Sequence, residues 1–303
     1  MKLRVLLAAL VFAAAVTALG IYIAQHNIAV LEPKGEIGEK ERQLMIIGTW
    51  LSALVVLPVF ALTFFITWKY REKNHRGRYT PDWDGHRGLE ALWWGIPCAI
   101  ILILAVIAIQ SSHSLDPFRP LAGKRPTLEV EVVALQWKWL FIYPEQKIAT
   151  VNYLQLPNDT PVTFHITSDA PMNSFWIPQL GGQVYAMSGM DTHLNLRANH
   201  IGVYEGVSAN LSGEGFAGMH FKTNVVEPTQ FEDWAAASHG KTGTLDRDAY
   251  EQLAKPSADV KPTVYGTVSP GLYDTVIAKY TVPAGAASNE GAGEGTGHAL
   301  SGY

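Results

Sequence analysis

Side chains that could hold a redox metal are scarce in this 303-residue chain. Cys98 is the only cysteine, and it lies inside an apolar run, where we expect it to serve as a small buried hydrophobe. One thiol excludes an internal disulfide and any site built on two thiolates. A mononuclear blue-copper site also needs a Cys beside two His. We therefore expect the histidines of the second half of the chain to be scattered over the surface. These are His165, His193, His200, His220, His239 and His298.

The stretch 206–220, GVSANLSGEGFAGMH, places Met219 beside His220. Successive residues of a strand point to opposite faces, so this pair is not expected to share a metal. We find no nucleophile elbow, paired-carboxylate motif or zinc-ligand spacing, which argues against a hydrolase domain. Glu90 directly precedes an apolar run, and the start of a helix stabilises a negative charge by its dipole.

Three apolar runs dominate the first third of the chain. Residues 5–24 follow Lys2 and Arg4, which is typical of a signal peptide, although the run is also long enough to remain as a membrane helix. The runs 44–68 and 91–109 carry no charge and predict two transmembrane helices. Two buried helices of a soluble protein are the alternative, which the length of the runs disfavours.

The loop 69–90 between these two helices holds six Lys/Arg and four Asp/Glu, whereas 25–43 holds three Lys/Arg. The positive-inside rule places this loop in the cytoplasm and the flanking segments on the outer face. The net charge of −4 and the lack of a basic run argue against a nucleic-acid partner.

The outer part alternates apolar and polar residues at 127–135, 162–167, 193–198 and 219–226, which predicts a β-sandwich or barrel. Short amphipathic helices are expected after Pro228, and a Gly-rich, disordered tail after 283. The complete predicted division is 1–24 signal peptide or retained helix, 25–43 outer segment, 44–68 transmembrane helix, 69–90 cytoplasmic loop, 91–111 transmembrane helix, 112–228 β-domain, 229–283 helical arm and 284–303 tail.

Several motifs occur in order along this plan, and together they resemble subunit II of the haem–copper oxidases. They are LEPKGEIG at 31–38, WKYREKN at 68–74, LEALWWGIP at 89–97, WKWLFIYPE at 137–145 and MNSFWIPQLGGQVYAMSGM at 172–190. The resemblance is greatest to the cytochrome bo-type, ubiquinol-oxidising branch and covers about residues 30–280. It implies an α+β membrane protein, with a transmembrane hairpin and a periplasmic cupredoxin-like domain.

In the cytochrome c-oxidising branch this domain carries a dinuclear copper centre, held by an upstream His and by Cys-x3-Cys-x3-His-x2-Met. Two bridging thiolates, imidazoles and a thioether suit copper. The resemblance places the upstream His at Asn173, the two Cys at Ser208 and Ser212, and the second His at Phe216. Met219 alone keeps a ligand type. We therefore expect a vestigial site without metal.

The resemblance implies a non-catalytic subunit of a proton-pumping ubiquinol:O2 oxidoreductase in the bacterial inner membrane. Haems and copper are expected in the partner subunit I, which would receive electrons from ubiquinol, with no cytochrome c as donor. Other oxidase subunits and membrane lipid are the remaining expected partners. No lipoprotein Cys follows the first run, so lipid anchoring there is not expected.

Two further interpretations depend on the resemblance. Glu90 corresponds to a Glu at the mouth of a proton-uptake path into subunit I, although the helix dipole alone would also favour Glu there. Trp137, Trp139, Phe141 and Tyr143 are expected to form an aromatic core or a subunit interface rather than a docking face for cytochrome c. The alternatives for the whole chain are a working copper-bearing subunit II, which the missing Cys pair disfavours, and a membrane-tethered cupredoxin-like assembly module outside any oxidase.

Overall fold

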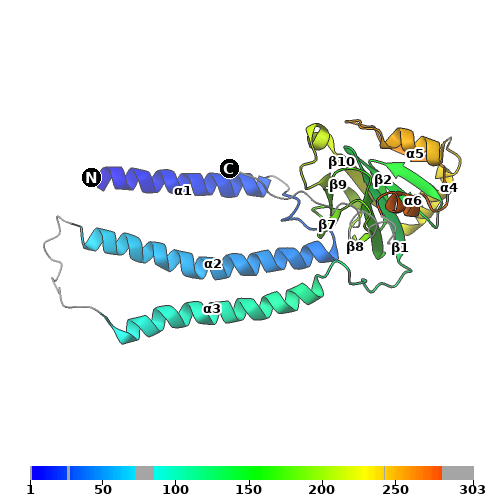
Figure 1. Ribbon diagram of the computed structural model, residues 1–303. Coiled ribbons are helices and arrows are strands. Elements are labelled where there is room, and N and C mark those ends of the chain that lie inside the picture. Colours follow the sequence, from blue (N-terminus) through cyan, green and yellow to red (C-terminus); the bar gives the residue numbers. More distant parts are fainter. Residues whose placement is uncertain (1, 26–27, 72–84, 242, 282–303) are drawn as a thin grey trace, which may run out of the picture.

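Long helices extend from one side of a β-domain in the computed structural model (Figure 1), which describes residues 2–25, 28–71, 85–241 and 243–281. They are α1 (Lys2–Gln25), α2 (Glu36–Lys69) and α3 (Arg87–Ser114). Part of the predicted loop 69–90, His298 and the predicted tail 284–303 lie outside the described residues. The helical form of α1 agrees with a signal peptide and with a retained helix alike.

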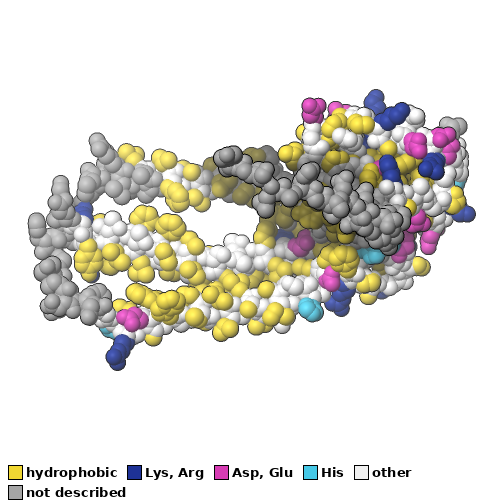
Figure 2. Space-filling view, viewed as in Figure 1, with side chains coloured by type: hydrophobic (Ala, Val, Ile, Leu, Met, Phe, Trp, Pro, Cys, Tyr) yellow, Lys and Arg dark blue, Asp and Glu magenta, His cyan; other side chains and the backbone are white. Residues whose placement is uncertain are grey.

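Helices α2 and α3 are long and apolar enough to cross a membrane. They contain 34 and 28 residues, so at about 1.5 Å per residue each exceeds a hydrocarbon core of about 30 Å. Figure 2 shows hydrophobic side chains along both helices, with charged side chains near their ends and over the β-domain. The predicted transmembrane hairpin is thus confirmed as a membrane anchor.

The helices differ from the predictions in two respects. Helix α2 begins at Glu36, before its apolar run, because Ile37 and Gly38 are buried against the β-domain and extend the helix beyond the membrane segment. The expectation that Cys98 is buried is wrong within this chain. Cys98 is exposed on α3, which buries none of its residues against the rest of the protein.

The β-domain is a sandwich of two sheets rather than a closed barrel. One sheet has the strand order β12-β3-β2-β1-β5-β8, and the other has the order β4-β10-β9-β6-β7. Pairing is parallel between β1 and β5 and between β4 and β10. The four segments that were predicted as strands from their alternation form β1, β5, β8 and β10. The strands of these sheets are β1 (Leu128–Leu135), β2 (Lys138–Tyr143), β3 (Ile148–Val151), β4 (Tyr153–Pro157), β5 (Val162–Ser168), β6 (Asn173–Trp176), β7 (Gln183–Ala186), β8 (Thr192–Leu196), β9 (Gly202–Ser208), β10 (His220–Val226) and β12 (Thr263–Tyr265).

Aromatic rings fill the space between the two sheets. Trp139 and Phe141 of β2 point inward and are fully buried. The Trp139 ring meets the Phe175 ring edge-on at 5.4 Å between centroids, and Phe141 lies 5.0 Å from Phe221. Tyr143 continues this face and meets Trp234 at 5.4 Å. The prediction of an aromatic core is therefore confirmed for the three β2 residues.

The first helix of the C-terminal arm contacts β4 and adds Phe231 to the core between the sheets, whereas the later helices form a layer over the outer face of the six-stranded sheet. The arm comprises α4 (Pro228–Ser238), β11 (Thr244–Leu245), α5 (Arg247–Ala254), β12, β13 (Thr267–Val268) and α6 (Leu272–Ala278). Short helices were expected here, but the arm also supplies β12, which pairs with β3 and so belongs to the sandwich. A second apolar core, including Leu140, Ile142 and Tyr273, lies beneath this layer.

Asp169 anchors this arm to the sandwich. Its carboxylate accepts hydrogen bonds from the Tyr250 hydroxyl at 2.7 Å, from the Lys279 ammonium at 2.7 Å and from the Tyr280 hydroxyl. Burial raises the pKa of Asp169, but the three hydrogen bonds outweigh burial and hold the pKa below its usual value. The ionised carboxylate is therefore the form that holds α5 and α6 in place.

The start of α2 joins the sandwich by direct backbone contact at the loop between β6 and β7. The Lys34 amide donates to the Gln179 carbonyl at 2.6 Å, and the Gly38 amide donates to the Leu180 carbonyl at 3.0 Å. Gly181 has a φ of +88°, and a Cβ there would lie 2.4 Å from the Gly38 nitrogen. Both the backbone conformation and the close approach therefore require glycine at 181.

We predict that Gly181→Ala separates α2 from the sandwich. The positive φ and the steric overlap should together cost about 2–4 kcal/mol. Hydrogen exchange of the backbone amides at 34–38 should accelerate, and the unfolding temperature should fall. Gly48→Ala is the matched control, because a Cβ at 48 on the same helix meets nothing within 4 Å. Unchanged amide exchange at 34–38 in Gly181→Ala would contradict this account.

Candidate functional site

Three of the five positions in the copper-ligand pattern meet where strands of the five-stranded sheet end. Asn173 opens β6, Ser208 closes β9, and Met219 directly precedes β10. All three are buried. The Ser208 hydroxyl donates to Asn173 Oδ1 at 3.0 Å, and the Ser208 amide donates to the Met219 carbonyl at 3.3 Å. The sequence-predicted residues Asn173, Ser208 and Met219 thus form one contiguous group.

The remaining two positions, Ser212 and Phe216, lie on the loop between β9 and β10. Phe216 belongs to the short 3-10 helix η1 (Glu214–Gly218) and is half-buried. Its carbonyl accepts the Met219 amide at 3.0 Å, which fixes the end of the loop against β10. The Ser212 Oγ is buried without a hydrogen-bond partner in the described part of the chain.

These five side chains do not supply the donors that a dinuclear copper centre requires. Such a centre needs bridging thiolates and imidazoles, whereas the positions hold an amide, two hydroxyls, a phenyl ring and one thioether. The Asn173–Ser208 hydrogen bond also occupies polar atoms at two of these positions. A network of neutral hydrogen bonds therefore stands where the pattern would place copper ligands.

Trp137 covers the loop that carries these residues. Its indole N–H donates to the Ser212 carbonyl at 3.1 Å, and its ring lies against Gly215, where a Cβ would come within 2.3 Å of the ring. Trp137 itself has a φ of +66° in the turn between β1 and β2. The fourth aromatic of the predicted cluster is therefore a half-buried cover over the loop rather than part of the inner core.

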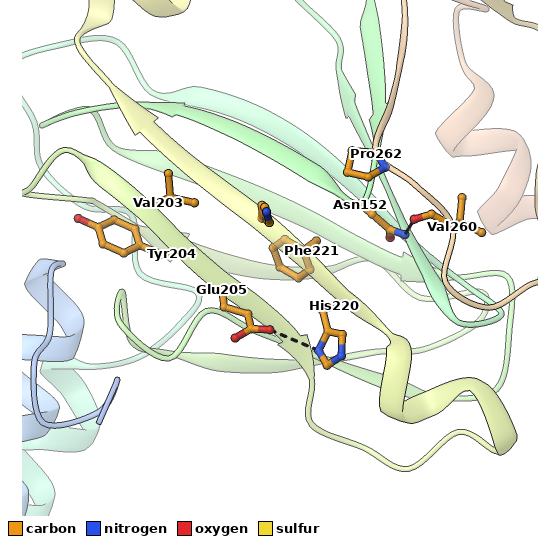
Figure 3. A pocket seen from close by; sticks show the side chains of 9 residues that line it. Asn152, Val203, Tyr204, Glu205, His220, Phe221, Val260 and Pro262 are labelled. Atoms are coloured by element: carbon orange, nitrogen blue, oxygen red, sulfur yellow. Dashed lines mark hydrogen bonds and ion pairs between the residues drawn. The ribbon is translucent and has the colours of Figure 1, made fainter. Parts of the chain in front are cut away.

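His220 faces away from this group, as the strand alternation predicts. Figure 3 shows the His220 side chain beside Glu205 at a surface pocket that also includes Tyr204 and Val260. His220 Nδ1 lies 3.6 Å from Glu205 Oε1, and both side chains are at least half exposed. Met219, its neighbour in sequence, is buried on the opposite face. The two adjacent residues do not combine into a metal site.

Glu90 lies far from this loop in the sequence, in the first turn of α3. The preceding His86 caps the helix, since its Nδ1 accepts the Leu89 amide at 3.2 Å, and the Glu90 amide donates to the His86 carbonyl at 3.0 Å. The Glu90 side chain is exposed. It is thus a solvent-facing carboxylate at the end of a membrane helix, as the sequence predicted.

The expectation of scattered histidines is wrong for His165 and His193. Residue His165 of β5 is paired in register with His193 of β8, and their ring centroids are 4.6 Å apart. Both rings contact Asp191. The two histidines occupy polar positions of alternating strands, but the sequence does not state which strands pair. That missing pairing is why the group was not predicted.

A membrane hairpin is joined to a β-sandwich, and Asn173, Ser208 and Met219 lie together where its strands end. This is the architecture expected of subunit II of an oxidase. The sequence pattern described as the COX Aromatic Rich Motif matches residues 240–284, which include the part of the C-terminal arm from β11 to α6. The periplasmic domain of subunit II of cytochrome oxidase from Bradyrhizobium japonicum is similar at 19% identity, with a TM-score of 0.37, over 39% of this chain and 96% of that chain.

Curated relatives extend the similarity to nearly the whole chain. Cytochrome bo(3) ubiquinol oxidase subunit 2 of Pseudomonas aeruginosa is 46% identical over 280 residues, covering 91% of this chain and 85% of the relative. Ubiquinol oxidase subunit 2 of Acetobacter aceti is 46% identical over 263 residues, covering 86% of this chain and 85% of the relative. Quinol oxidase subunit 2 of Bacillus subtilis is 38% identical over 232 residues, covering 76% of this chain and 72% of the relative. The chain belongs to the ubiquinol oxidase subunit 2 family.

We predict that four substitutions restore copper binding to the strand ends. Asn173→His, Ser208→Cys, Ser212→Cys and Phe216→His, with Met219 retained, should bind a pair of copper ions and give a mixed-valence band in the near infrared. Copper analysis and absorption spectra of the purified chain provide the measurement. The unaltered chain should bind no stoichiometric copper at this position.

A control variant with Ser212 retained should lack the band, because one of the two bridging thiolates is absent. A folded four-substitution variant that binds no copper would contradict the assignment of the ligand positions. A copper pair in the unaltered chain would do so as well.

Proposed function

We propose that this chain is the non-catalytic subunit II of a proton-pumping respiratory ubiquinol:O2 oxidoreductase. The observation that carries the proposal is the similarity to ubiquinol oxidase subunit 2, which covers 91% of this chain and so includes the membrane hairpin with the β-domain. A tethered assembly module outside an oxidase would not require that similarity to continue through both helices. The oxidase role is therefore favoured over this alternative.

The donor set at the strand ends supports ubiquinol, rather than cytochrome c, as the source of electrons. With Ser208 and Ser212 in place of thiolates, the loop offers no bridging ligand for a copper pair. Electrons would then pass from ubiquinol to haem in the partner subunit I, which would carry the haems and copper of the complex. The copper-ligand positions in this chain are a vestige of a metal site.

The physical role of the chain follows from its exposed surfaces. Helices α2 and α3 present large apolar side chains, such as Trp50, Phe64 and Leu102, with more than half of their surface accessible. Membrane lipid and the helices of subunit I are suitable partners for such surfaces. The β-domain, held to the start of α2, would cap the outer face of subunit I.

The charge distribution supports the orientation of the complex. The loop 69–90 carries six Lys/Arg beside the ends of both membrane helices. By the positive-inside rule this loop is cytoplasmic, so the β-domain lies in the periplasm of a bacterium whose inner membrane holds the hairpin.

An affinity tag on this chain allows the proposed function to be tested. We expect the purified assembly to contain a large haem-bearing subunit and to consume oxygen with ubiquinol-1 as the electron donor. Reduced cytochrome c should support no oxygen consumption. Isolation of the chain without haem, or rapid turnover with cytochrome c, would overturn the proposal.

Glu90 is our candidate for the mouth of a proton-uptake path into subunit I. Its carboxylate is exposed in the first turn of α3, at the end of the helix that the charge rule places in the cytoplasm. A carboxylate in this position can take protons from water and pass them inward.

We predict that Glu90→Gln slows turnover of the assembled oxidase by roughly 10-fold while leaving its haem content unchanged. Glu90→Asp should retain more activity, because it keeps a carboxylate at the same position. Glu39→Gln is the control, since Glu39 is also an exposed acid in the first turn of a membrane helix but at the opposite end of the hairpin. Normal proton-coupled turnover in Glu90→Gln would exclude the role.

A further inference from the structure

A compact group of two histidines and one aspartate lies on the outer face of the six-stranded sheet, on and beside strands β5 and β8. His165 Nδ1 is 3.2 Å from Asp191 Oδ2, and His193 Nε2 is 3.0 Å from the same oxygen. Potential ligand atoms of the three residues all lie within 4.8 Å of one another. We propose that His165, Asp191 and His193 form a site for a divalent transition-metal cation of the Zn²⁺ class.

Two of the three separations in this group are close to those in a metal coordination shell. Tetrahedral Zn²⁺ with bonds of about 2.0 Å holds its ligands about 3.3 Å apart. The two distances to Asp191 Oδ2, 3.2 and 3.0 Å, are within a few tenths of an ångström of this value. A small outward movement of the side chains would admit the ion.

The residues around the group hold the ligands in a suitable orientation. His165 Nε2, the ring nitrogen that does not face Asp191, is 3.1 Å from Glu129 Oε2. A carboxylate that accepts the second N–H of a histidine fixes the tautomer and raises the basicity of the ligating nitrogen. The other Asp191 oxygen, Oδ1, accepts the Tyr273 hydroxyl at 2.8 Å. Outer partners of this kind accompany metal ligands in proteins.

The strand register gives this group its rigidity. Glu131, His165 and His193 are neighbours across β1, β5 and β8, so two of the ligands project from the same side of paired strands. Glu129 of β1, 3.1 Å from His165 Nε2, adds the negative charge of a second carboxylate beside this group. That charge favours a cation over an anion.

The group is accessible from solvent. The side chains of His165, Asp191 and His193 retain 29%, 36% and 39% of their surface. An ion can therefore enter without unfolding the sheet, and water can complete its coordination. Because imidazole nitrogen is preferred by Zn²⁺ and related ions, Mg²⁺ and Ca²⁺, which prefer oxygen ligands, should bind poorly.

Zinc titration of the full-length chain in detergent, purified without a polyhistidine tag, tests the proposal. We expect saturable binding of one Zn²⁺ per chain and an increase in unfolding temperature with zinc. His165→Gln and His193→Gln should each weaken binding by at least about 100-fold, and Glu129→Gln by about 10-fold. Mg²⁺ at the same concentration should not raise the unfolding temperature.

His220→Gln is the matched control, because His220 is also a strand histidine beside a carboxylate, but among the described residues it belongs to no group of possible metal ligands. It should bind zinc as the unaltered chain does. X-ray absorption at the zinc edge of the unaltered chain provides a readout that does not depend on the folding of any variant. Two imidazole ligands are expected at about 2.0 Å.

Absence of saturable zinc binding would overturn the proposal. So would binding that persists undiminished in His165→Gln and His193→Gln, or a zinc coordination shell without imidazole. None of these readouts depends on oxidase activity or on the identity of subunit I, so the metal site and the proposed function succeed or fail independently.

Discussion

The contact between Gly38 and Gly181 determines how the membrane part and the outer part of this protein are joined. A Cβ at 181 would overlap the backbone of α2, so the two segments approach as bare main chain. The approach brings the Gly38 amide to the Leu180 carbonyl, and Glu41 accepts the Gly182 amide at 3.1 Å. The start of α2 is therefore fixed directly to the sandwich by main-chain contact.

The same region of the sandwich also receives the chain that leaves the second membrane helix. Beyond α3, the Pro117 carbonyl accepts both the backbone amide and the side-chain amide of Asn195 in β8. Just after β8, Arg197 donates to the Ala122 carbonyl at 2.8 Å and forms an ion pair with Glu36 at the start of α2. Both ends of the hairpin are thus held at one strand, which sets the orientation of the β-domain over the membrane.

Much of this architecture could be predicted from the sequence, because each decisive signal is local. The uncharged runs give α2 and α3, and the period-two alternation gives β1, β5, β8 and β10. The inward positions of β2, Trp139 and Phe141, follow from the same rule. The early start of α2 was not predicted, since it depends on a loop more than a hundred residues away.

The copper-ligand positions could be predicted from the sequence, whereas the histidine group could not. A known motif assigns Asn173, Ser208 and Met219 to one place, and the structure brings them into contact. No motif connects His165 with His193, whose proximity depends on the antiparallel pairing of β5 with β8. In the C-terminal arm, α4 and α5 could be predicted from their local amphipathic patterns. Strand β12 could not be predicted, because it forms only by pairing with β3.

The bridge between Gly35 and Ala198 has a consequence for biosynthesis. The ribosome makes residues 35–38, at the start of α2, before the rest of the hairpin, but their partners at 179–198 appear only after the hairpin and most of the sandwich have been translated. The amino-terminal contacts must therefore wait until the segment 179–198 has been made and has folded. Long-range closure of this kind is slow, so attachment of the β-domain to its anchor is a late event in maturation.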